Sequence, residues 1–322
     1  MTVLAGIDIG GTKCAVSIGR LQEDRIELLG KRRFPTPPDP ALTISQLLVE
    51  LDLLADEVGV DRISAIGISC GGPLDSRTGR ILSPPNLPNW DAVNIVAPFK
   101  ERFGVPVGLQ NDANAGALAE WQWGAGRGLE HIVFLTFGTG MGAGMILNGR
   151  LYSGTNDMAG EVGHIRLDQH GPIGYGKLGS FEGYCSGGGI AQLARTYAEN
   201  AISSGVIPRY CPVPDQLSGI TAEQVGIAAQ AGDATAIAVF TEVGRRLGQG
   251  LAILIDMLNP QRIIIGSIFG RQEALLRPFV MQVLQEEALS HSLSVCEIVP
   301  AGLGEQIGDY ASLSVALHTL KT

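Results

Sequence analysis

A glycine pair flanked by an aspartate, a threonine and a lysine lies between two apolar runs near the start of the chain. It follows the run from Val3 to Ile7 and precedes the run from Cys14 to Ile18, and it reads Asp8-Ile9-Gly10-Gly11-Thr12-Lys13. Two β-prone runs joined in this way predict a hairpin. Glycines let backbone N–H groups approach an anion closely, while the threonine and lysine add a hydroxyl donor and a positive charge. One such motif more often marks an ordinary turn, so a second motif is needed to indicate a phosphate site.

A second glycine-rich segment follows the apolar run from His131 to Phe134. It reads Leu135-Thr136-Phe137-Gly138-Thr139-Gly140-Met141-Gly142-Ala143-Gly144. A dinucleotide-binding fingerprint would open a helix, but Asn148-Gly149 between apolar residues predicts another hairpin here. Neither segment has the P-loop pattern. Two Gly/Thr hairpins in two halves of the chain, both suited to phosphate oxygens, suggest a nucleotide held between two domains.

Three further segments carry more polar side chains than their local structure requires. The segment Gln110-Asn111-Asp112-Ala113-Asn114 precedes an Ala-rich helical run, and at least one of its side chains is expected to be the N-cap. The proline-rich segment 83–90 cannot form regular structure and carries Asn86, Asn89 and Trp90. Glu161, His164 and Glu182 recur in a Gly-rich segment that packing alone does not explain.

A Gly-Gly-Pro turn at the end of an expected strand, Gly71-Gly72-Pro73, is open to two interpretations. It is equally typical of a plain connection and of backbone that faces a ligand.

Alternating strands and helices must position these residues. Besides the two hairpins we expect strands at 25–34, 63–69, 105–109, 262–265 and 294–299, and helices at 42–58, 115–123, 190–202, 222–231, 234–258, 271–288 and 309–320. A length of 322 residues favours about two domains, and a β-Gly-β hairpin at the start of each half suggests an old duplication.

Composition narrows the class of protein. Hydrophobic residues make up 45% and charged residues 17%, which favours packed cores over disorder. The chain shows no apolar run of membrane-spanning length and no secretion signal, and its five cysteines lack a C-x-x-C pair, so we expect a cytoplasmic protein with free thiols. A net charge of -9 argues against binding a nucleic-acid backbone but not against a nucleotide site.

Five of these motifs occur in the order and spacing of the ROK family, which joins bacterial sugar kinases with sugar-responsive repressors. They are Asp8–Lys13, Asn86–Trp90, Asn111–Asn114, Leu135–Gly140 and Gly160–His164. The resemblance spans nearly the whole chain and implies the actin-like, hexokinase-like ATPase (ribonuclease H-like) fold, with the active site in the cleft between two α/β domains. It places the smaller domain at 1–112 plus 309–322, because the last helix crosses back, and the larger at 113–308.

The resemblance also implies a role for each candidate residue. Asp112 matches the general base that takes the proton of the attacking sugar hydroxyl. The residues that match the sugar-binding set are Gly71, Gly72, Asn86, Asn111, Glu161, His164 and Glu182. Those that match the ATP-binding set are Gly10, Gly11, Thr12, Lys13, Gly138, Thr139, Gly140 and Gly266. Asp8 matches the residue that helps to hold Mg²⁺ through water, and the family's glycine run near the adenosine is reduced to Gly266-Ser267-Ile268.

The chain departs from the family pattern at a metal site. Many members carry C-x-C-G-x-x-G-C-x-E, in which the three cysteines and the preceding histidine bind structural zinc. Aligned on Glu182, this chain has Ile173, Tyr175 and Ser180 at the cysteine positions. A Cys₃His site cannot form without thiolates, so we expect no zinc, with apolar or hydrogen-bonded contacts holding the loop instead.

Taken together, the motifs and the resemblance predict an ATP- and Mg²⁺-dependent kinase that phosphorylates a hydroxyl, expected to be the 6-hydroxyl, of a hexose or an N-acetylhexosamine. Glucose, N-acetylglucosamine, N-acetylmannosamine, fructose and allose kinases of the family share the hydroxyl-binding residues, so the sequence does not select among them. The alternative is a sugar-sensing regulator without kinase activity, but only Met1 and Thr2 precede the first strand, where the family's repressors carry a DNA-binding module. By family habit we expect a homodimer, with no nucleic-acid or membrane partner.

Overall fold

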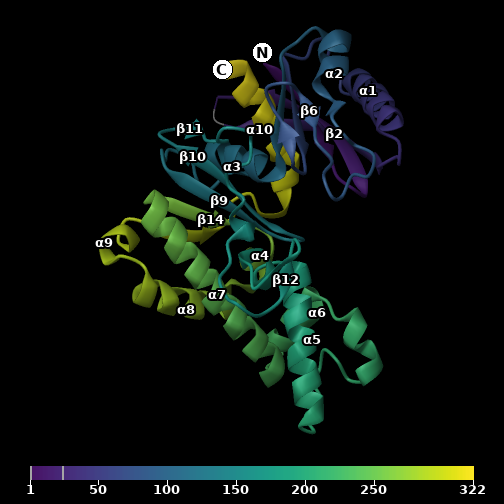
Figure 1. Cartoon of the computed structure of the whole chain (residues 1–322). Coiled ribbons are helices and arrows are strands. Elements are labelled where there is room, and N and C mark those ends of the chain that lie inside the picture. Colours follow the sequence, from purple (N-terminus) through teal and green to yellow (C-terminus); the bar gives the residue numbers. More distant parts are fainter. Residues whose placement is uncertain (1, 24) are drawn as a thin grey trace. The chain divides into compact units, whose positions relative to one another are not determined.

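The computed structural model describes residues 2–23 and 25–322, so Met1 and Asp24 lie outside the described residues. The chain divides into two compact units (Figure 1). The first comprises residues 1–130, 144–159 and 302–322, and the second comprises residues 131–143 and 160–301. The first unit therefore includes residues 113–130 and 144–159, which the sequence-based boundaries place in the larger domain.

The first unit is built on a five-stranded sheet in which the first glycine turn joins two neighbouring strands. Its strands are β1 (Val3–Ile9), β2 (Lys13–Leu21), β3 (Ile26–Pro35), β4 (Ala65–Cys70) and β8 (Val107–Asn111), in the order β3-β2-β1-β4-β8. The pairs β1–β2 and β2–β3 are antiparallel, which confirms the expected hairpin. Strands β1, β4 and β8 run parallel, so their carboxyl ends meet at one edge of the sheet.

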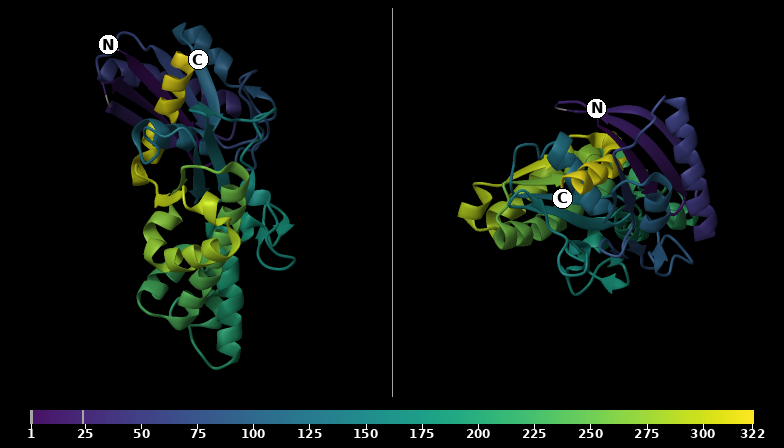
Figure 2. Two further views of the ribbon diagram at one scale, coloured as in Figure 1. Left: turned by 90° about the vertical axis from the view of Figure 1, so that its left-hand side faces the viewer. Right: turned by 90° about the horizontal axis from the view of Figure 1, so that it is seen from above.

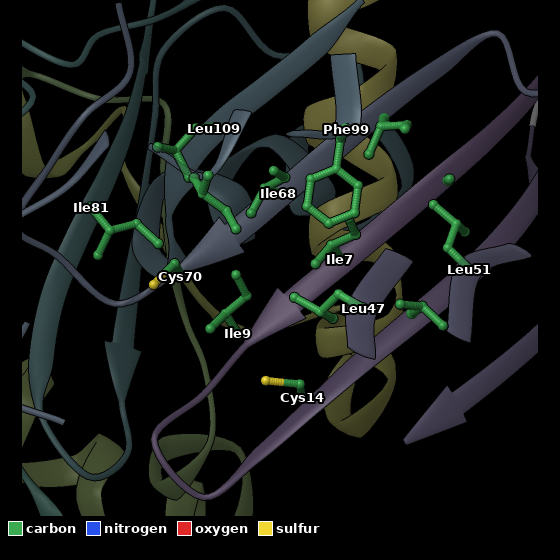
Figure 3. Packing of buried hydrophobic residues seen from close by; sticks show 14 of the residues in the cluster. Ile7, Ile9, Cys14, Leu47, Leu51, Ile68, Cys70, Ile81, Phe99 and Leu109 are labelled. Carbon is green, nitrogen blue, oxygen red and sulfur yellow. The ribbon is translucent and has the colours of Figure 1, made fainter. Parts of the chain in front are cut away.

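Helices cover this sheet, and the main core lies between the sheet and the first two of them. The helices are α1 (Pro40–Glu57), α2 (Val96–Phe103), α3 (Asp112–Trp123) and α10 (Ile307–Lys321), the last preceded by the short helix η3 (Gly304–Gln306). Figure 3 shows Ile7 of β1 and Ile68 of β4 packed with Leu47 of α1 and Phe99 of α2. The segment 83–90 forms neither helix nor strand, as its prolines predict. Short strands flank it: β5 (Leu74–Asp75), β6 (Arg80–Ile81) and β7 (Val93–Asn94).

The last helix lies directly on the sheet because two paired strand positions lack side chains. Gly6 of β1 and Gly67 of β4 are neighbours across the sheet. A Cβ built on Gly67 would lie 2.1 Å from the carbonyl oxygen of Ser312 and 2.2 Å from the amide nitrogen of Ala316. In Figures 1 and 2 this helix (yellow) lies beside the N-terminal strands (purple). The C-terminal helix therefore belongs to the first unit, packed against β1, β4, β8 and α3.

The second unit combines three parallel strands with a group of packed helices. Its strands are β9 (Ile132–Phe137), β14 (Arg262–Ile265) and β15 (Glu297–Pro300). Strand β10 (Met141–Leu147) crosses the boundary at Gly144 and pairs with β11 (Arg150–Leu151) in the first unit. The main helices are α5 (Gly187–Ser203), α6 (Ala222–Gln230), α7 (Ala234–Leu258) and α8 (Ile268–Glu287), and α7 packs against the other three (Figure 1).

Shorter elements complete the second unit. They are η1 (Val162–His164), β12 (Ile173–Gly174), β13 (Lys177–Leu178), α4 (Phe181–Tyr184), η2 (Pro214–Gly219) and α9 (Ser290–Leu293). The expected strand over 294–299 is shorter and later, because α9 and the turn after it occupy the chain up to β15. Helix α8 begins three residues earlier than expected and is kinked at Gln272.

Within residues 2–23 and 25–322, no helix is both long and apolar enough to span a membrane. All five cysteines are free thiols and four of them are buried, as expected.

Replacing Gly67 with alanine should destabilise the protein, because the new methyl group would collide with the backbone of α10. Overpacking of this kind typically costs about 1–3 kcal/mol of unfolding free energy. The matched control is Gly308→Ala within α10, where no atom lies within 4 Å of the added Cβ; removing a helical glycine stabilises by up to about 1 kcal/mol. Urea unfolding of both variants tests this contrast, and equal midpoints would contradict the proposed packing of α10.

Candidate functional site

Three candidate segments of the first unit begin at one row of its sheet. Ile9, Cys70 and Asn111 are aligned across the parallel strands β1, β4 and β8. The residue after each of them is a candidate, namely Gly10, Gly71 and Asp112. Ligands of open α/β sheets bind at the carboxyl ends of the strands. The register of the sheet thus gathers segments that are widely separated in the sequence.

The first glycine turn is narrow and lies against the proline-rich loop. The N–H of Gly10 donates to the carbonyl oxygen of Lys13 over 3.1 Å, and the Thr36 hydroxyl donates to the carbonyl oxygen of Gly10 over 2.6 Å. A Cβ built on Gly11 would lie 2.3 Å from the carbonyl oxygen of Asn86. Only glycine permits this approach, whereas the side chains of Thr12 and Lys13 remain exposed at the tip. The turn therefore offers accessible donors and brings the Asn86 loop next to them.

The Asn86 loop is fixed by a buried tryptophan. Trp90 is 1% exposed and belongs to the core, so it does not line a polar site. Its carbonyl oxygen accepts from the N–H of Ser83 over 2.8 Å, which closes the loop. The side chain of Asn86 stays exposed on this loop, which the buried Trp90 anchors.

Asn111 and Asp112 form the start of α3. The Asn111 side chain is the N-cap: its Oδ1 accepts from the N–H of Asn114 over 2.7 Å, which leaves its amide N–H₂ as a donor. Asp112 is the first helical residue, and its Oδ1 accepts from the N–H of Ala113 over 2.9 Å. A Cβ built on Gly72 would lie 3.9 Å from the Asn111 Cβ, so the Gly-Gly turn adjoins this pair.

The Asp112 carboxylate is accessible but surrounded by protein. Desolvation raises the pKa of Asp112, while hydrogen bonds from backbone N–H groups oppose the shift. Because the side chain is still exposed, solvent weakens the desolvation. An exposed carboxylate at a helix N-terminus, where the helix dipole favours the ionised form, is suited to accept a proton as a general base.

Asp8 carries a second carboxylate close to this edge. Burial raises the pKa of Asp8 to about 6, and the charge of Asp112 adds to the shift, while Lys31, Lys13 and Arg33 oppose it. A divalent cation beside Asp8 would supply the missing charge, so the residue fits a magnesium ion held mainly by phosphate oxygens and water. In the described ranges, no group of three or more His, Cys, Asp or Glu side chains could form a metal site of its own.

The second glycine turn adjoins the start of two helices. The N–H of Gly138 donates to the carbonyl oxygen of Gly140 over 3.2 Å, and the N–H of Gly187 donates to the carbonyl oxygen of Gly138 over 2.8 Å. A Cβ built on Gly138 would lie 3.5 Å from the Ser267 Oγ. Thr139 is exposed at the tip. The N–H of Gly266, the residue before Ser267, donates to the carbonyl oxygen of Leu135 on the strand that leads into the turn, over 3.0 Å.

Glu182 connects this turn to the Glu/His segment. Its Oε2 accepts from the N–H of Met141 over 3.1 Å, and a Cβ built on Gly140 would lie 2.9 Å from the same oxygen. A Cβ built on Gly163 would lie 3.2 Å from the Glu182 Cβ, so η1 packs against α4. Glu161 and His164, at the two ends of η1, are exposed. Within the second unit, the structure thus brings the turn and the segment of Glu161, His164 and Glu182 together.

Hydrogen bonds and one aromatic contact hold the loop at the former cysteine positions. Ser180 is buried, and its hydroxyl donates to the carbonyl oxygen of Gly174 over 3.3 Å and accepts from the N–H of Gly183 over 3.1 Å. The Tyr175 ring meets the His164 ring edge-on with centroids 5.8 Å apart. These contacts are of the kind expected in place of a metal.

The candidate residues fall into two groups, one in each unit. The first holds Asp8, Gly10, Gly11, Thr12, Lys13, Gly71, Gly72, Asn86, Asn111 and Asp112, and the second holds Gly138, Thr139, Gly140, Glu161, His164, Glu182 and Gly266. The sequence-based reasoning did not include Gly187 and Ser267, which both lie beside the second turn. The run Ser186-Gly187-Gly188-Gly189 before a helix was an available signal for Gly187. The place of Ser267 in the reduced glycine run was a signal for Ser267, which has a φ of 55°.

The model of the ROK family matches residues 4–317. The chain belongs to the ROK family. A glucokinase of Halalkalibacterium halodurans is 32% identical over 310 residues, covering 94% of this chain and 91% of the relative. The crystal structure of a ROK family glucokinase from Streptomyces griseus in complex with glucose and AMPPNP has a TM-score of 0.77 at 29% identity, covering 98% and 99% of the two chains.

The ROK chain is also similar to a regulator. The crystal structure of a ROK family transcriptional regulator, a homologue of the E. coli MLC protein, has a TM-score of 0.85 at 25% identity. That match covers 99% of this chain and 78% of the regulator. The comparisons confirm the expected fold class, because the ROK glucokinase structures have the actin-like, hexokinase-like ATPase fold.

The stability difference between Asp8→Asn and the wild-type ROK protein should depend on pH. The folded state keeps the Asp8 proton up to about pH 6, whereas the unfolded chain releases it near the ordinary value of 3.8. Ionisation of Asp8 therefore lowers the wild type's unfolding free energy as the pH rises through this window. Asp8→Asn does not undergo this loss. The unfolding free energy of the variant relative to the wild type should therefore rise between about pH 4 and pH 7 and then level off. Urea unfolding across this range tests the effect, and a difference that does not change with pH would contradict it.

We expect purified, untagged protein to contain no stoichiometric zinc, because Ile173, Tyr175 and Ser180 supply no thiolate. Chelator treatment should leave the fold and sugar binding intact, and Mg²⁺ alone should restore any lost turnover. Elemental analysis and thermal unfolding with and without chelator provide the measurements. Stoichiometric zinc, or unfolding that only zinc reverses, would show that this loop is aligned wrongly.

Proposed function

We propose that the protein is an ATP-dependent kinase that transfers the γ-phosphate to a hydroxyl, expected to be the 6-hydroxyl, of a hexose or an N-acetylhexosamine. The observation that carries the proposal is the aligned row Ile9–Cys70–Asn111, after which the sheet presents a glycine turn, a Gly-Gly turn and a carboxylate at a helix N-terminus. The similarity to glucokinases supports the same function.

In the first unit, Asp112 is proposed to accept the proton of the attacking hydroxyl. Its place as the first residue of α3 favours the ionised form through the helix dipole, and its exposed oxygens can reach a bound substrate. Asn111 offers its free amide N–H₂, and Asn86 offers an exposed amide, so both can bond other sugar hydroxyls. Gly71 and Gly72 bring backbone close to the same place.

Backbone donors at both glycine turns are proposed to hold phosphate oxygens. Gly10, Gly11, Thr12 and Lys13 form the first set, and Gly138, Thr139 and Gly140 form the second. Asp8 would help to hold Mg²⁺ through water, and the ion would supply positive charge that offsets the charge of the phosphates. Gly266 is proposed to lie at the adenosine side, beside Ser267.

The second unit is proposed to supply the remaining sugar contacts. Glu161, His164 and Glu182 present carboxylate and imidazole groups near one another, and a carboxylate can accept from two neighbouring hydroxyls. Which hexose fits is a property of the loops that carry these residues.

A sugar-sensing regulator without kinase activity is the second candidate, favoured by the similarity to the ROK transcriptional regulator. The two candidates differ in one measurement, since only a kinase releases ADP in the presence of a sugar. A panel of glucose, fructose, allose, N-acetylglucosamine and N-acetylmannosamine in a coupled ADP-release assay tests both. ADP release with none of these sugars, combined with retained sugar binding, would support the regulator.

In the same assay, Asp112→Asn should lower kcat by about 10²–10⁴-fold, which is the typical contribution of a positioned base. Sugar binding should persist, because the amide keeps the size and the cap at Asn111 is untouched. The control is Asp61→Asn, an exposed aspartate in another part of the first unit, which should leave kcat unchanged. Turnover of Asp112→Asn close to the wild-type rate would remove Asp112 from the mechanism.

A further inference from the structure

We propose that Glu182 is a positioning residue for the nucleotide as well as a sugar ligand: one carboxylate oxygen holds the second glycine turn in its phosphate-binding conformation, even when no sugar is bound. This inference rests on the proposed kinase function. It adds a role on the nucleotide side to a residue whose expected role lies on the sugar side.

The two oxygens of Glu182 are in different situations. Oε2 accepts from the N–H of Met141, the residue that follows the turn. Among the described residues, Oε1 has no hydrogen-bond partner, so it can accept from a sugar hydroxyl while Oε2 stays on the turn. A charge-assisted bond of this kind is stronger than a bond between neutral groups.

The tip of the turn is short and rich in glycine. It consists of two glycines around the exposed Thr139, and glycine loses more conformational freedom on ordering than any other residue. Among the described residues, the N–H of Gly138 donates to Gly140 and the N–H of Gly187 donates to Gly138, while at the base of the turn the N–H of Gly142 donates to the Thr136 hydroxyl over 2.9 Å. Fixing the turn in advance lowers the ordering cost that phosphate binding would otherwise meet.

The element that carries Glu182 is rigid enough to act as the anchor. Phe181 is fully buried, and a Cβ on Gly250 of α7 would lie 2.4 Å from its ring. Tyr184 donates to the carbonyl oxygen of His170 over 2.9 Å, and the Arg246 guanidinium lies 4.7 Å from its ring centroid. Helix α4 is thus fixed at both ends. The hydrogen bond that the Glu182 carboxylate accepts from Met141 then fixes the turn relative to α4.

The contact between Glu182 and Gly140 makes each residue sensitive to a change of the other. Gly140 has no side chain where Glu182 Oε2 lies, since a Cβ there would be 2.9 Å from that oxygen. A methyl group at this position would push the carboxylate aside and disturb the oxygen that faces the sugar. A change in the turn should therefore weaken sugar binding, just as a change of Glu182 should weaken nucleotide binding.

The test is binding of Mg²⁺ with AMPPNP to the full-length protein in the absence of sugar, measured by calorimetry. Glu182→Ala should raise the Kd about tenfold, since it removes a hydrogen bond to a charged acceptor. Glu182→Gln keeps an oxygen acceptor and should recover most of that affinity. The control is Glu199→Ala, the same change at an exposed glutamate of α5 in the second unit, which should leave this Kd unchanged. Thermal unfolding verifies that each variant is folded.

The reciprocal measurement is sugar affinity of Gly140→Ala, with the hexose accepted by the wild type, which should fall severalfold. The inference is overturned if Glu182→Ala binds AMPPNP within about twofold of wild type, or if Glu199→Ala weakens AMPPNP binding equally. If the wild type binds neither AMPPNP nor any sugar of the panel, the proposed function itself is overturned. Should Glu182→Ala not fold, Gly140→Ala decides: unchanged sugar affinity overturns the inference.

Discussion

The chemistry of the first unit depends on the register of three parallel strands. Ile9, Cys70 and Asn111 lie in one row, so the residue that follows each of them lies at the same edge of the sheet. A shift of one residue in β8 would move Asp112 away from this edge and reverse the face of every side chain on that strand. The register is held from the other side by α10, which lies on Gly6 and Gly67 too closely for any side chain. Residues from the end of the chain thus help to set the geometry of a site near its start.

The second unit shows the same construction with other residues. Leu135, Ile265 and Pro300 are aligned on β9, β14 and β15, and Gly266 follows this row beside the second glycine turn. In each unit a glycine turn touches a residue proposed to bind sugar: Gly11 meets the Asn86 backbone and Gly140 meets the Glu182 carboxylate. The internal similarity that the sequence suggests therefore extends from the hairpins to the contacts around them.

Local signals in the sequence predicted most of the longer elements and indicated most candidate residues, because hairpins, caps and apolar periodicity are decided by neighbours in the chain, but helix α2 (Val96–Phe103) was not predicted. These signals could not show which polar groups stabilise the fold and which remain available to a ligand. Asn111 is both a candidate ligand and the N-cap of α3, and only the hydrogen bond from Asn114 shows which of its atoms remains free. Trp90 was a candidate for the site but is buried in the core, since its burial depends on α1 and the sheet rather than on its own segment. Ser267 was missed because its position beside Gly138 results from strand pairing far away in sequence.

The loop at the former cysteine positions shows how order can be supplied without thiolates. A zinc site fixes its ligands through a few strong bonds, whereas hydrogen bonds, ion pairs and packing contacts hold this loop. Ser180 caps the short helix α4, Phe181 fills a space that Gly250 leaves open, and Arg246 joins Asp168 of the loop to Glu242 of α7. At the partly buried Arg246 the charge of Glu242 and the hydrogen bonds to Glu242 and Asp168 offset the desolvation of the guanidinium, and the Tyr184 ring lies against it. The position of Glu182 thus depends on hydrogen bonds, ion pairs and packing contacts that lie within the second unit itself.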